Sequence, residues 1–205
     1  MTEIEDKFVN DFYETNAKSF SDTRRCGWDW IDDFVNKLNE QSTFYYDIGC
    51  GNGRNLTIGN SIGIDNCQAF IDEINQNGKK AIKSDMTEIK LPSESTDAII
   101  CIAAFHHLAT IERRLKALTE MRRLIRLNVK MLLSVWSINQ PENRKVQFDK
   151  YGDSYVSWTK NNQTYNRYYY IFQIDEIKQL FESTNWKIIN HYWKEGNEVF
   201  ELEAI

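Results

Sequence analysis

Proline and glycine are scarce in this chain, which has two prolines and nine glycines among 205 residues. No proline-rich, repeated or low-complexity stretch divides the sequence, and its length is sufficient for one well-buried core. No run of 18 apolar residues is present, and the acidic start does not resemble a signal peptide. We therefore expect a single domain over residues 1–205 with no membrane association.

Cysteine is also rare, and the four cysteines show no CxxC spacing. They are Cys26, Cys50, Cys67 and Cys101. Paired spacing is the usual sign of a zinc site or a redox-active pair, so we expect reduced thiols and no bound metal. A cytoplasmic protein fits this pattern, with the nucleus as a further compartment. The net charge of −5 argues mildly against a protein that binds nucleic acid over its whole surface.

The most informative segment is a glycine-rich run after a short apolar stretch, Phe44-Tyr45-Tyr46-Asp47-Ile48-Gly49-Cys50-Gly51-Asn52-Gly53. Glycine at every second position lets a ligand approach the backbone and makes positive φ angles accessible. The dinucleotide fingerprint needs a further glycine three residues after Gly51, where this chain has Arg54. The run instead resembles motif I of the class I S-adenosylmethionine methyltransferases. The alternative is a glycine-rich turn after any buried strand.

Acidic residues also follow later predicted strands. Residues 61–65 end at Asp65, residues 80–85 end at Asp85, and residues 97–103 are nearly all apolar, as in a strand buried on both faces. Ligands of open α/β sheets bind beyond the carboxyl ends of the strands, so Asp65 suits ribose hydroxyls and Asp85 an adenine amino group. The resemblance implies S-adenosylmethionine as cofactor and S-adenosylhomocysteine as product. The expected cofactor-binding residues are Asp47, Gly49, Cys50, Gly51, Asn52, Gly53, Asp65, Asn66, Asp85, Met86 and Ile102.

The remaining pattern predicts two helices before the glycine-rich loop and an alternation of strands and helices after it. Residues 49–60 are too few for an ordinary crossover helix between the first two strands. The other helices and strands are expected at 3–18, 28–39, 67–77, 110–126, 130–136, 175–183, 187–193 and 198–204. With the motif I resemblance, this predicts an α/β class I methyltransferase fold: a Rossmann-like, seven-stranded, mostly parallel sheet with a C-terminal antiparallel hairpin. N-terminal helices (1–40) would cover a cofactor-binding core (43–136), followed by a substrate-side connection and the hairpin (137–205).

Four segments outside the glycine-rich loop point to one family. They are Phe20-Ser21-Asp22-Thr23-Arg24 with Trp28, residues 102–114 with their His-His and Arg-Arg pairs, Trp136 with Gln140, and Val156-Ser157-Trp158 with Arg167-Tyr168-Tyr169-Tyr170. Together they resemble the eukaryotic tRNA methyltransferases that esterify the carboxymethyl group on the wobble uridine. The resemblance extends from about Phe8 to Phe200, and implies methyl transfer to the carboxylate of 5-carboxymethyluridine in the anticodon arm. The chain departs from the family pattern at Cys26-Gly27, Ser157 and Tyr170.

The chemistry of this reaction suggests roles for individual residues. A carboxylate with a pKa near 4 is already ionised at pH 7, so it needs orientation rather than a general base. A bidentate arginine fits that task, with Arg24 as the first candidate and His106 or His107 as the second. The alternatives are a surface cation for Arg24, and a helix cap or packing residue for the histidines. The expected substrate-binding residues are Trp28, Arg113, Arg114, Trp136, Trp158, Arg167, Tyr168, Tyr169 and Tyr170.

Basic residues crowd one predicted helix and its exit, between Arg113 and Lys130, opposed there only by Glu120. Such a cluster suits phosphate contacts, although a solvated helix face is an equally simple explanation. Arg167 lies among tyrosines, which can stack a splayed anticodon base or simply cover the edge of the sheet.

The family resemblance also implies a partner, a small zinc-binding activator subunit that pairs along an exposed strand edge to give a heterodimer. The third strand, within residues 79–84, would be the edge of this sheet, and its flanking lysines are of the kind that protect an edge from pairing. Two other functions remain open. One is a methyltransferase of the same fold that acts on a small molecule, and the other is a cofactor-binding subunit without activity.

Overall fold

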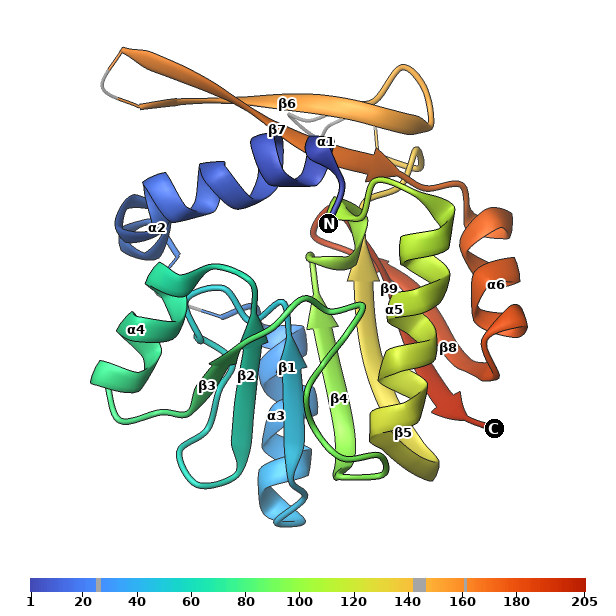
Figure 1. The fold of residues 1–205 in the computed structure, drawn as a ribbon. Coiled ribbons are helices and arrows are strands. Elements are labelled where there is room, and N and C mark those ends of the chain that lie inside the picture. The colour runs from blue at the N-terminus through green and yellow to red at the C-terminus, as the bar shows by residue number, and fades with distance from the viewer. Residues whose placement is uncertain (25–26, 142–146, 161) are drawn as a thin grey trace.

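A seven-stranded sheet forms the centre of the chain, with the strand order β3-β2-β1-β4-β5-β9-β8 (Figure 1). The computed structural model describes residues 1–24, 27–141, 147–160 and 162–205. Neighbouring strands are parallel except at β9, which runs antiparallel to both β5 and β8. The strands are β1 Tyr45–Ile48, β2 Ser61–Asp65, β3 Ala81–Lys83, β4 Thr96–Ile102, β5 Ile125–Val135, β8 Trp186–Lys194 and β9 Asn197–Ala204. The predicted fold class, including the position of the third strand at the edge, is confirmed.

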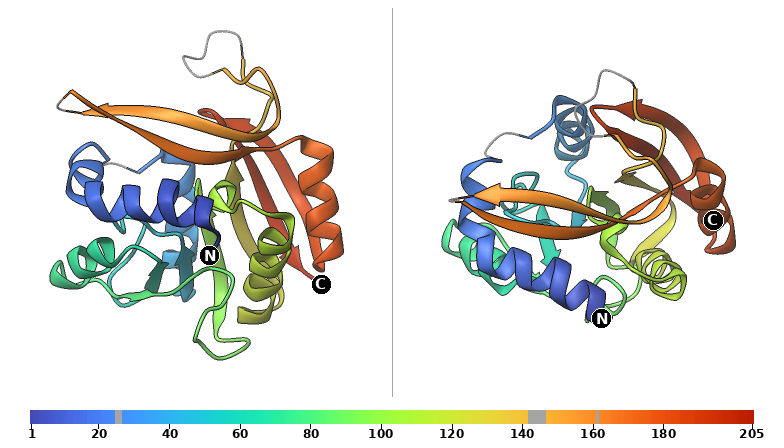
Figure 2. Two further views of the ribbon diagram at one scale, coloured as in Figure 1. Left: turned by 45° about the horizontal axis from the view of Figure 1, so that its top comes forward. Right: turned by 90° about the horizontal axis from the view of Figure 1, so that it is seen from above.

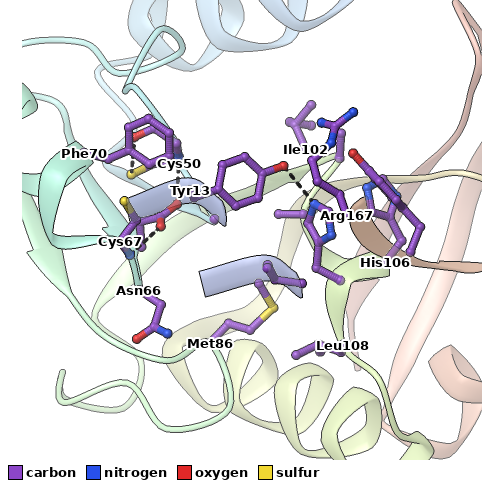
Figure 3. A pocket seen from close by; sticks show the side chains of 18 of the residues that line it. Tyr13, Cys50, Asn66, Cys67, Phe70, Met86, Ile102, His106, Leu108 and Arg167 are labelled. Carbon is purple, nitrogen blue, oxygen red and sulfur yellow. Dashed lines mark hydrogen bonds between the residues drawn. The ribbon is translucent and has the colours of Figure 1, made fainter. Parts of the chain in front are cut away.

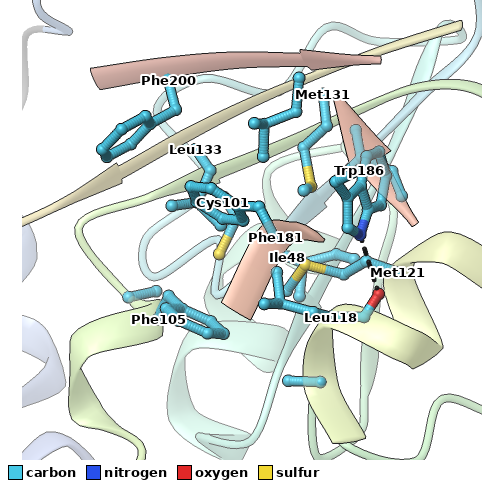
Figure 4. Close-up of a cluster of buried hydrophobic side chains, with 14 of the residues drawn as sticks. Ile48, Cys101, Phe105, Leu118, Met121, Met131, Leu133, Phe181, Trp186 and Phe200 are labelled. Atoms are coloured by element: carbon cyan, nitrogen blue, oxygen red, sulfur yellow. Dashed lines mark hydrogen bonds between the residues drawn. The ribbon is translucent and has the colours of Figure 1, made fainter. Parts of the chain in front are cut away.

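Helices cover both faces of the sheet, and successive residues of the central strand β4 pack against opposite layers. Ile99 and Cys101 pack in a cluster with side chains of α5 and α6, whereas Ile100 and Ile102 pack with α3. The helices are α3 Asp29–Glu40, α4 Gln68–Gln76, α5 Ile111–Leu124 and α6 Ile174–Ser183. Figure 4 shows part of the first cluster, with Leu118 of α5 and Phe181 of α6 among the labelled side chains. A strand covered on both faces has no polar side, which explains the apolar run at residues 97–103.

The connection from β1 to β2 contains turns and no helix. Residues 49–60, all of which the structure describes, bend back over a short distance to start β2. Helix α3, which precedes β1, covers the sheet on this side and buries Ile31 completely against β1 and β4. The glycine-rich loop therefore leads directly from one central strand to the next, as its length predicted.

Helix α5 and strand β5 follow one another without a loop, which corrects the predicted boundaries. The helix ends at Leu124 rather than at residue 126, and the strand begins at Ile125 rather than at residue 130. Ile125 is fully buried and pairs with Thr96 at the start of β4. Burial of this β-branched residue favours the extended conformation over another helical turn.

Two segments form a roof across the carboxyl ends of the parallel strands (Figures 1 and 2). One is the N-terminal helical segment, in which α1 Glu3–Glu5, the π-helical turn η1 Asp6–Asn10 and α2 Asp11–Asp22 follow without a break. The other is a hairpin of β6 Gly152–Lys160 and β7 Gln163–Ile171, a two-stranded sheet of its own. Phe12 of α2 packs edge-to-face on Trp158 at 5.4 Å between ring centroids. The sequence predicted a substrate-side connection in this region but not a hairpin.

None of the helices in the described ranges is long and apolar enough to cross a lipid bilayer.

Candidate active site

A cavity of about 350 Å³ lies under the roof, at the carboxyl ends of β1, β2 and β4. Figure 3 shows Cys67 and Phe70 on one side of it and Ile102 and His106 on the other, with Tyr13 of the N-terminal helical segment between them. The predicted site residues that line the cavity are Arg24, Trp28, Gly49, Cys50, Gly51, Asn52, Asp65, Asn66, Asp85, Met86, Ile102, His106, His107, Arg113, Trp136, Arg167 and Tyr169. The cavity therefore brings together residues predicted to bind the cofactor and residues predicted to bind or orient the substrate.

The three glycines of the loop have positive φ angles of +73° at Gly49, +52° at Gly51 and +70° at Gly53, but different surroundings. A Cβ atom at Gly49 would lie 2.2 Å from the Cβ of Ala104, and one at Gly53 would lie 2.7 Å from a side-chain carbon of Ile74. A Cβ at Gly51 would instead meet no close contact, because its nearest neighbour, a ring carbon of Phe20, lies at an ordinary van der Waals distance of 3.7 Å. Packing explains the outer two glycines, and the middle one leaves backbone exposed for a ligand.

Asp65 anchors the loop at the end of β2. One carboxylate oxygen accepts the backbone N–H of Gly51 at 2.8 Å, and the other accepts that of Cys67 at 2.9 Å, just before α4. Burial raises the pKa of Asp65, against the opposing effect of these hydrogen bonds. The carboxylate is thus held at the cavity wall beside the exposed backbone of the glycine-rich loop.

Asp47, at the end of β1, lies behind the loop and is 1% exposed. Neither carboxylate oxygen accepts a hydrogen bond from any residue that the structure describes. Burial and the charge of Asp65 raise the pKa of Asp47 to about 7, although Arg54 and Lys79 act in the opposite direction. An acid without a hydrogen-bond partner next to the cavity favours a ligand that carries positive charge.

Asp85 follows β3 at the far end of the cavity, and both of its carboxylate oxygens already have partners. Oδ1 accepts hydrogen bonds from the backbone and hydroxyl of Thr87, and Oδ2 accepts one from Arg113 Nη2 at 2.7 Å. Burial alone would raise the pKa of Asp85, but the Thr87 and Arg113 contacts outweigh it and lower the pKa. Asp85 is therefore ionised and fixed in position.

The two histidines that follow β4 are buried and neutral. His106 Nδ1 accepts the backbone N–H of Trp136 at 3.0 Å, so the neutral ring carries its proton on Nε2. Burial, with the charge of Arg167, lowers the pKa of His106 well below its usual range. His107 contacts the hydroxyl of Tyr13 and the backbone oxygen of Tyr168, and burial lowers its pKa to about 4.

Two arginines face the cavity without a countercharge. Arg167 of β7 is 7% exposed, its Nε has no hydrogen-bond partner, and its guanidinium lies 5.3 Å from the ring centroid of Tyr169. Arg24 lies 4.1 Å from the ring centroid of Phe20 at the end of α2. Among the described residues neither arginine forms an ion pair with an acid. Burial and the nearby Arg167 charge lower the pKa of Arg24, as expected for two cations that share one pocket.

Aromatic rings line the side of the cavity nearest to β5. Trp136 stacks on Tyr169 with centroids 4.3 Å apart, and its ring centroid lies 5.7 Å from that of Phe148. Trp28 also lines the cavity, and the guanidinium of Arg54 covers its ring at 4.4 Å. These rings give the cavity flat apolar walls next to the arginine pair.

Other predicted site residues do not line the cavity. They are Asp47, Gly53, Arg114, Trp158, Tyr168 and Tyr170. Arg114 is 3% exposed, donates to the backbone oxygens of Leu108 and Ala109, and stacks 3.4 Å from the ring centroid of Tyr170. It supports the start of α5 rather than facing a substrate.

Several cations of the predicted basic cluster are paired with acids, from α5 itself or from other parts of the chain. Helix α5 runs from the cavity towards the opposite end of the sheet (Figure 1). Lys116 pairs with Glu88, Arg123 with Glu120, and Arg126 with Asp97. The cations at the far end of this helix lie away from the cavity, so the cluster does not form one continuous surface with the site.

The cavity also contains residues that were not predicted as site residues, among them Tyr13, Phe70 and Phe148, and Phe20, which belongs to the predicted Phe20–Arg24 segment. Tyr13 and Phe20 are seven residues apart and share a helix face, but an aromatic stripe of this kind is equally typical of a core-packing helix. Among the described residues, no group of three His, Cys, Asp or Glu side chains is arranged to hold a metal ion.

The sequence and the fold are both similar to known methyltransferases. A family model described as "Methyltransferase domain" matches residues 46–133. A putative methyltransferase of Encephalitozoon cuniculi is 30% identical over 98% of this chain and 96% of its own length. The tRNA (carboxymethyluridine(34)-5-O)-methyltransferase of Schizosaccharomyces pombe is 30% identical over 95% of each chain. The mouse ALKBH8 methyltransferase of the same description is 38% identical over 71% of this chain, which covers only 22% of that longer protein.

Solved structures share the fold at low sequence identity. An amino pentose methyltransferase of Micromonospora echinaspora (CalS10) with bound S-adenosylmethionine superposes with a TM-score of 0.69 at 16% identity, covering 92% of this chain and 96% of that one. The glycopeptide N-methyltransferase MtfA, solved with S-adenosylhomocysteine, gives a TM-score of 0.66 at 12% identity, covering 89% of this chain and 91% of that one. At these identities the likeness concerns the fold alone.

Proposed function

The chain belongs to the family of class I methyltransferases that includes the S. pombe tRNA (carboxymethyluridine(34)-5-O)-methyltransferase, and on this premise we propose that it esterifies a carboxymethyl group on the wobble uridine of tRNA. The methyl donor would be S-adenosylmethionine and the acceptor the carboxylate of 5-carboxymethyluridine in the anticodon. The observation that carries this proposal is the pair Arg24 and Arg167, two cations that line the same cavity and form no ion pair with an acid among the described residues.

The cofactor end of the cavity suits S-adenosylmethionine. The absence of a close contact at Gly51 leaves room for the methionine part against the backbone, and Asp65 stands where ribose hydroxyls would need an acceptor. The acids at this end, Asp47 included, favour a donor that carries an ammonium and a sulfonium charge. When bound, this cofactor supplies an electrophilic methyl group.

The acceptor end of the cavity suits a carboxylate. An arginine can hold a carboxylate with two parallel hydrogen bonds, which fixes the oxygen lone pairs in direction as well as in place. Arg24 follows the end of α2 and Arg167 lies on β7, so a carboxylate between them would connect the two parts of the roof. A neutral acceptor would leave the buried cation of Arg167 and the half-buried cation of Arg24 uncompensated, which is costly.

His106 fits the same role without adding charge. Its proton lies on Nε2 because Nδ1 accepts from Trp136, and its low pKa keeps the ring neutral at pH 7. A neutral donor can orient the carboxylate without withdrawing as much electron density as a third cation would. The acceptor is already ionised, so no residue has to remove a proton, and the task of the site is alignment and exclusion of water.

The aromatic walls suit the uracil ring to which the carboxylate is attached. Trp136, Tyr169 and Trp28 present flat surfaces beside the arginine pair. A wobble base turned out of the anticodon loop can stack on such rings, which is the common way that proteins bind single-stranded RNA bases.

We also propose that the chain works as a heterodimer with a small zinc-binding activator in the cytoplasm. The support is the family resemblance together with β3, which ends the sheet after only three residues and leaves one side without a strand neighbour in the described part of the chain. Co-expression with a candidate activator, followed by size-exclusion chromatography and zinc analysis, tests this. A monodisperse monomer with full activity on tRNA would refute it.

The experiment that tests the function uses the full chain, labelled S-adenosylmethionine and three anticodon stem-loops that differ only at the wobble base. We expect transfer to 5-carboxymethyluridine and none to uridine or to the 5-carbamoylmethyl amide. The label should be released by mild alkali, because the product is an ester. Transfer to the amide or to uridine at a similar rate would contradict a carboxylate acceptor.

A further inference from the structure

Three charged side chains connect the far end of the cavity to the N-terminal helical segment. Arg113 Nη2 donates to Asp85 Oδ2 at 2.7 Å, and Arg113 Nε lies 2.6 Å from Glu5 Oε2. One guanidinium thus pairs with Asp85, which follows β3, and with Glu5 on α1, which lies 80 positions before Asp85 in the sequence. We propose that Arg113 is a positioning residue that couples cofactor binding at Asp85 to closure of the N-terminal helical segment over the cavity. This inference rests on the proposed cofactor.

Glu5 depends on Arg113 because it is buried. The side chain is 4% exposed, and its second carboxylate oxygen accepts the backbone N–H of Ala109 at 2.7 Å. A buried carboxylate is stable only when its charge is paired, and removal of one partner leaves a costly unpaired charge. Without Arg113, the favourable response is for Glu5 to return to water, which lifts the start of the segment away from the loop before α5.

Asp85 provides the link to the ligand. It lines the cavity together with Arg113, and Thr87 holds its other oxygen, so the carboxylate cannot turn without losing those bonds. A ligand that donates a hydrogen bond to Asp85 changes how strongly this acid competes with Glu5 for the guanidinium. The same guanidinium therefore responds to the ligand and holds the segment, which is the requirement for coupling between two sites.

The segment is built for reversible closure. Val9, Asn10, Tyr13 and Phe20 line the cavity, so the segment covers the ligand space directly. Its middle contains a π-helical turn, Asp6–Asn10, a feature that is frequent at functional sites. Besides the Arg113 contact, polar groups attach it to α4. Glu14 accepts the backbone N–H of Gln68 at 2.6 Å.

The Glu14 contact offers a matched control on the same segment. It attaches the segment to α4 without touching Asp85 or Arg113. Glu14→Gln should therefore loosen the segment in the absence of cofactor but leave the response to cofactor intact. Arg123→Lys is a second control, because Arg123 lies on the same helix as Arg113 but at its far end.

The test measures S-adenosylmethionine affinity by calorimetry and backbone hydrogen exchange of residues 1–22, on the full chain with and without cofactor. In the wild type, cofactor should slow exchange in this segment. Arg113→Lys keeps the charge but loses the fork that reaches both acids, so we expect affinity to fall about tenfold, in the usual range for coupled sites, and the cofactor-dependent protection to disappear. Glu5→Gln, which can keep the Ala109 hydrogen bond, should give the same result and serves if Arg113→Lys does not fold.

The outcomes separate this inference from the proposed function. If the wild type binds cofactor and Arg113→Lys and Glu5→Gln bind it as tightly as Arg123→Lys does, the coupling is overturned and the cofactor assignment stands. If Glu14→Gln abolishes the cofactor-dependent protection as completely as Arg113→Lys, Arg113 is only one of the contacts that hold the segment, and the coupling is also overturned. If the wild type does not bind S-adenosylmethionine at all, the proposed function fails, and the coupling fails with it.

Discussion

The hydroxyl of Tyr13 lies 3.1 Å from Nε2 of His107, whose Nδ1 lies 2.8 Å from the backbone oxygen of Tyr168. A neutral imidazole satisfies both contacts only when Nδ1 carries the proton and Nε2 accepts from the hydroxyl. The ring thereby joins α2 to β7, the two parts of the roof. Both nitrogens of His107 are occupied, so between the two histidines His106 is the better candidate for contact with the acceptor.

Tyr13→Phe should destabilise the chain by about 1–3 kcal/mol, because it leaves Nε2 of the buried His107 without a donor. Urea unfolding followed by circular dichroism measures the change. Tyr165→Phe is the matched control, since it removes a hydroxyl from the same roof, but one that contacts Gln163 at the surface. Equal stabilities of the two variants would contradict a structural role for the Tyr13–His107 contact.

Gly51→Val should abolish S-adenosylmethionine binding while the fold persists. The added side chain would enter the space where we place the methionine part, and a β-branched residue is strained at a φ of +52°. Gly78→Val is the control for strain alone, because Gly78 has a φ of +77° at the end of α4 with open space around it. Calorimetry should show binding to the control only. Wild-type affinity in Gly51→Val would remove this glycine from the cofactor site.

The cofactor half of the site could be predicted from the sequence because its signals are local. Each parallel strand delivers its last residues to the same edge of the sheet, so the positions of Asp65 and Asp85 at strand ends are enough to place both near the glycine-rich loop. The distinct roles of the glycines could not be predicted. They depend on Ala104 and Ile74, which reach the loop from other elements.

The roof and the charge pairing were not predictable for a related reason. In the sequence, Arg113 is one of several basic residues on a helix, and its ion-pair partner Glu5 lies 108 positions earlier, so the sequence near Arg113 does not predict the pair. Strands β6 and β7 mix polar and aromatic residues without strict alternation, so their pattern does not distinguish a hairpin from an irregular connection. The packing of the N-terminal helical segment on the hairpin, as in the contact of Phe12 with Trp158, shows which face is covered.

Asp47→Asn should change the pH dependence of stability. Burial raises the pKa of Asp47 to about 7 from an ordinary value of 3.8, so the folded chain binds more protons than the unfolded chain between these values. Asp47 therefore lowers stability progressively as pH rises through about 4 to 7, by an amount on the order of 4 kcal/mol in full. Asparagine cannot ionise, so the stability of the variant relative to the wild type should increase as pH rises over this window.

His107 has the opposite effect in the wild type. Its pKa is lowered to about 4, so the buried neutral ring makes the folded chain less stable as pH falls below about 6.5. It is present in both proteins, so it cancels in the comparison. Urea unfolding at pH 5 and pH 8 measures the difference between Asp47→Asn and the wild type. A difference that stays constant with pH would show that Asp47 is not titrating in this range.

The last prediction concerns the arginine pair. Arg24→Ala should lower turnover on 5-carboxymethyluridine stem-loops by roughly 100-fold or more, with little change in RNA affinity, because it orients one small group in the transition state. Arg167→Met should have a similar effect and should also stabilise the fold or leave it unchanged, since it removes a buried cation that has no ion-pair partner among the described residues. Stopped-time methylation assays and filter binding separate the two quantities.

Arg126→Ala provides the control for this pair, because Arg126 pairs with Asp97 near the start of β5, remote from the cavity. It should leave turnover unchanged, and its effect on RNA affinity should be small, since its charge is already neutralised. If Arg24→Ala and Arg167→Met both turn over normally, the carboxylate is held elsewhere. His106 would then be the remaining predicted donor in the cavity, and the proposed acceptor would have to be oriented by a neutral hydrogen bond alone.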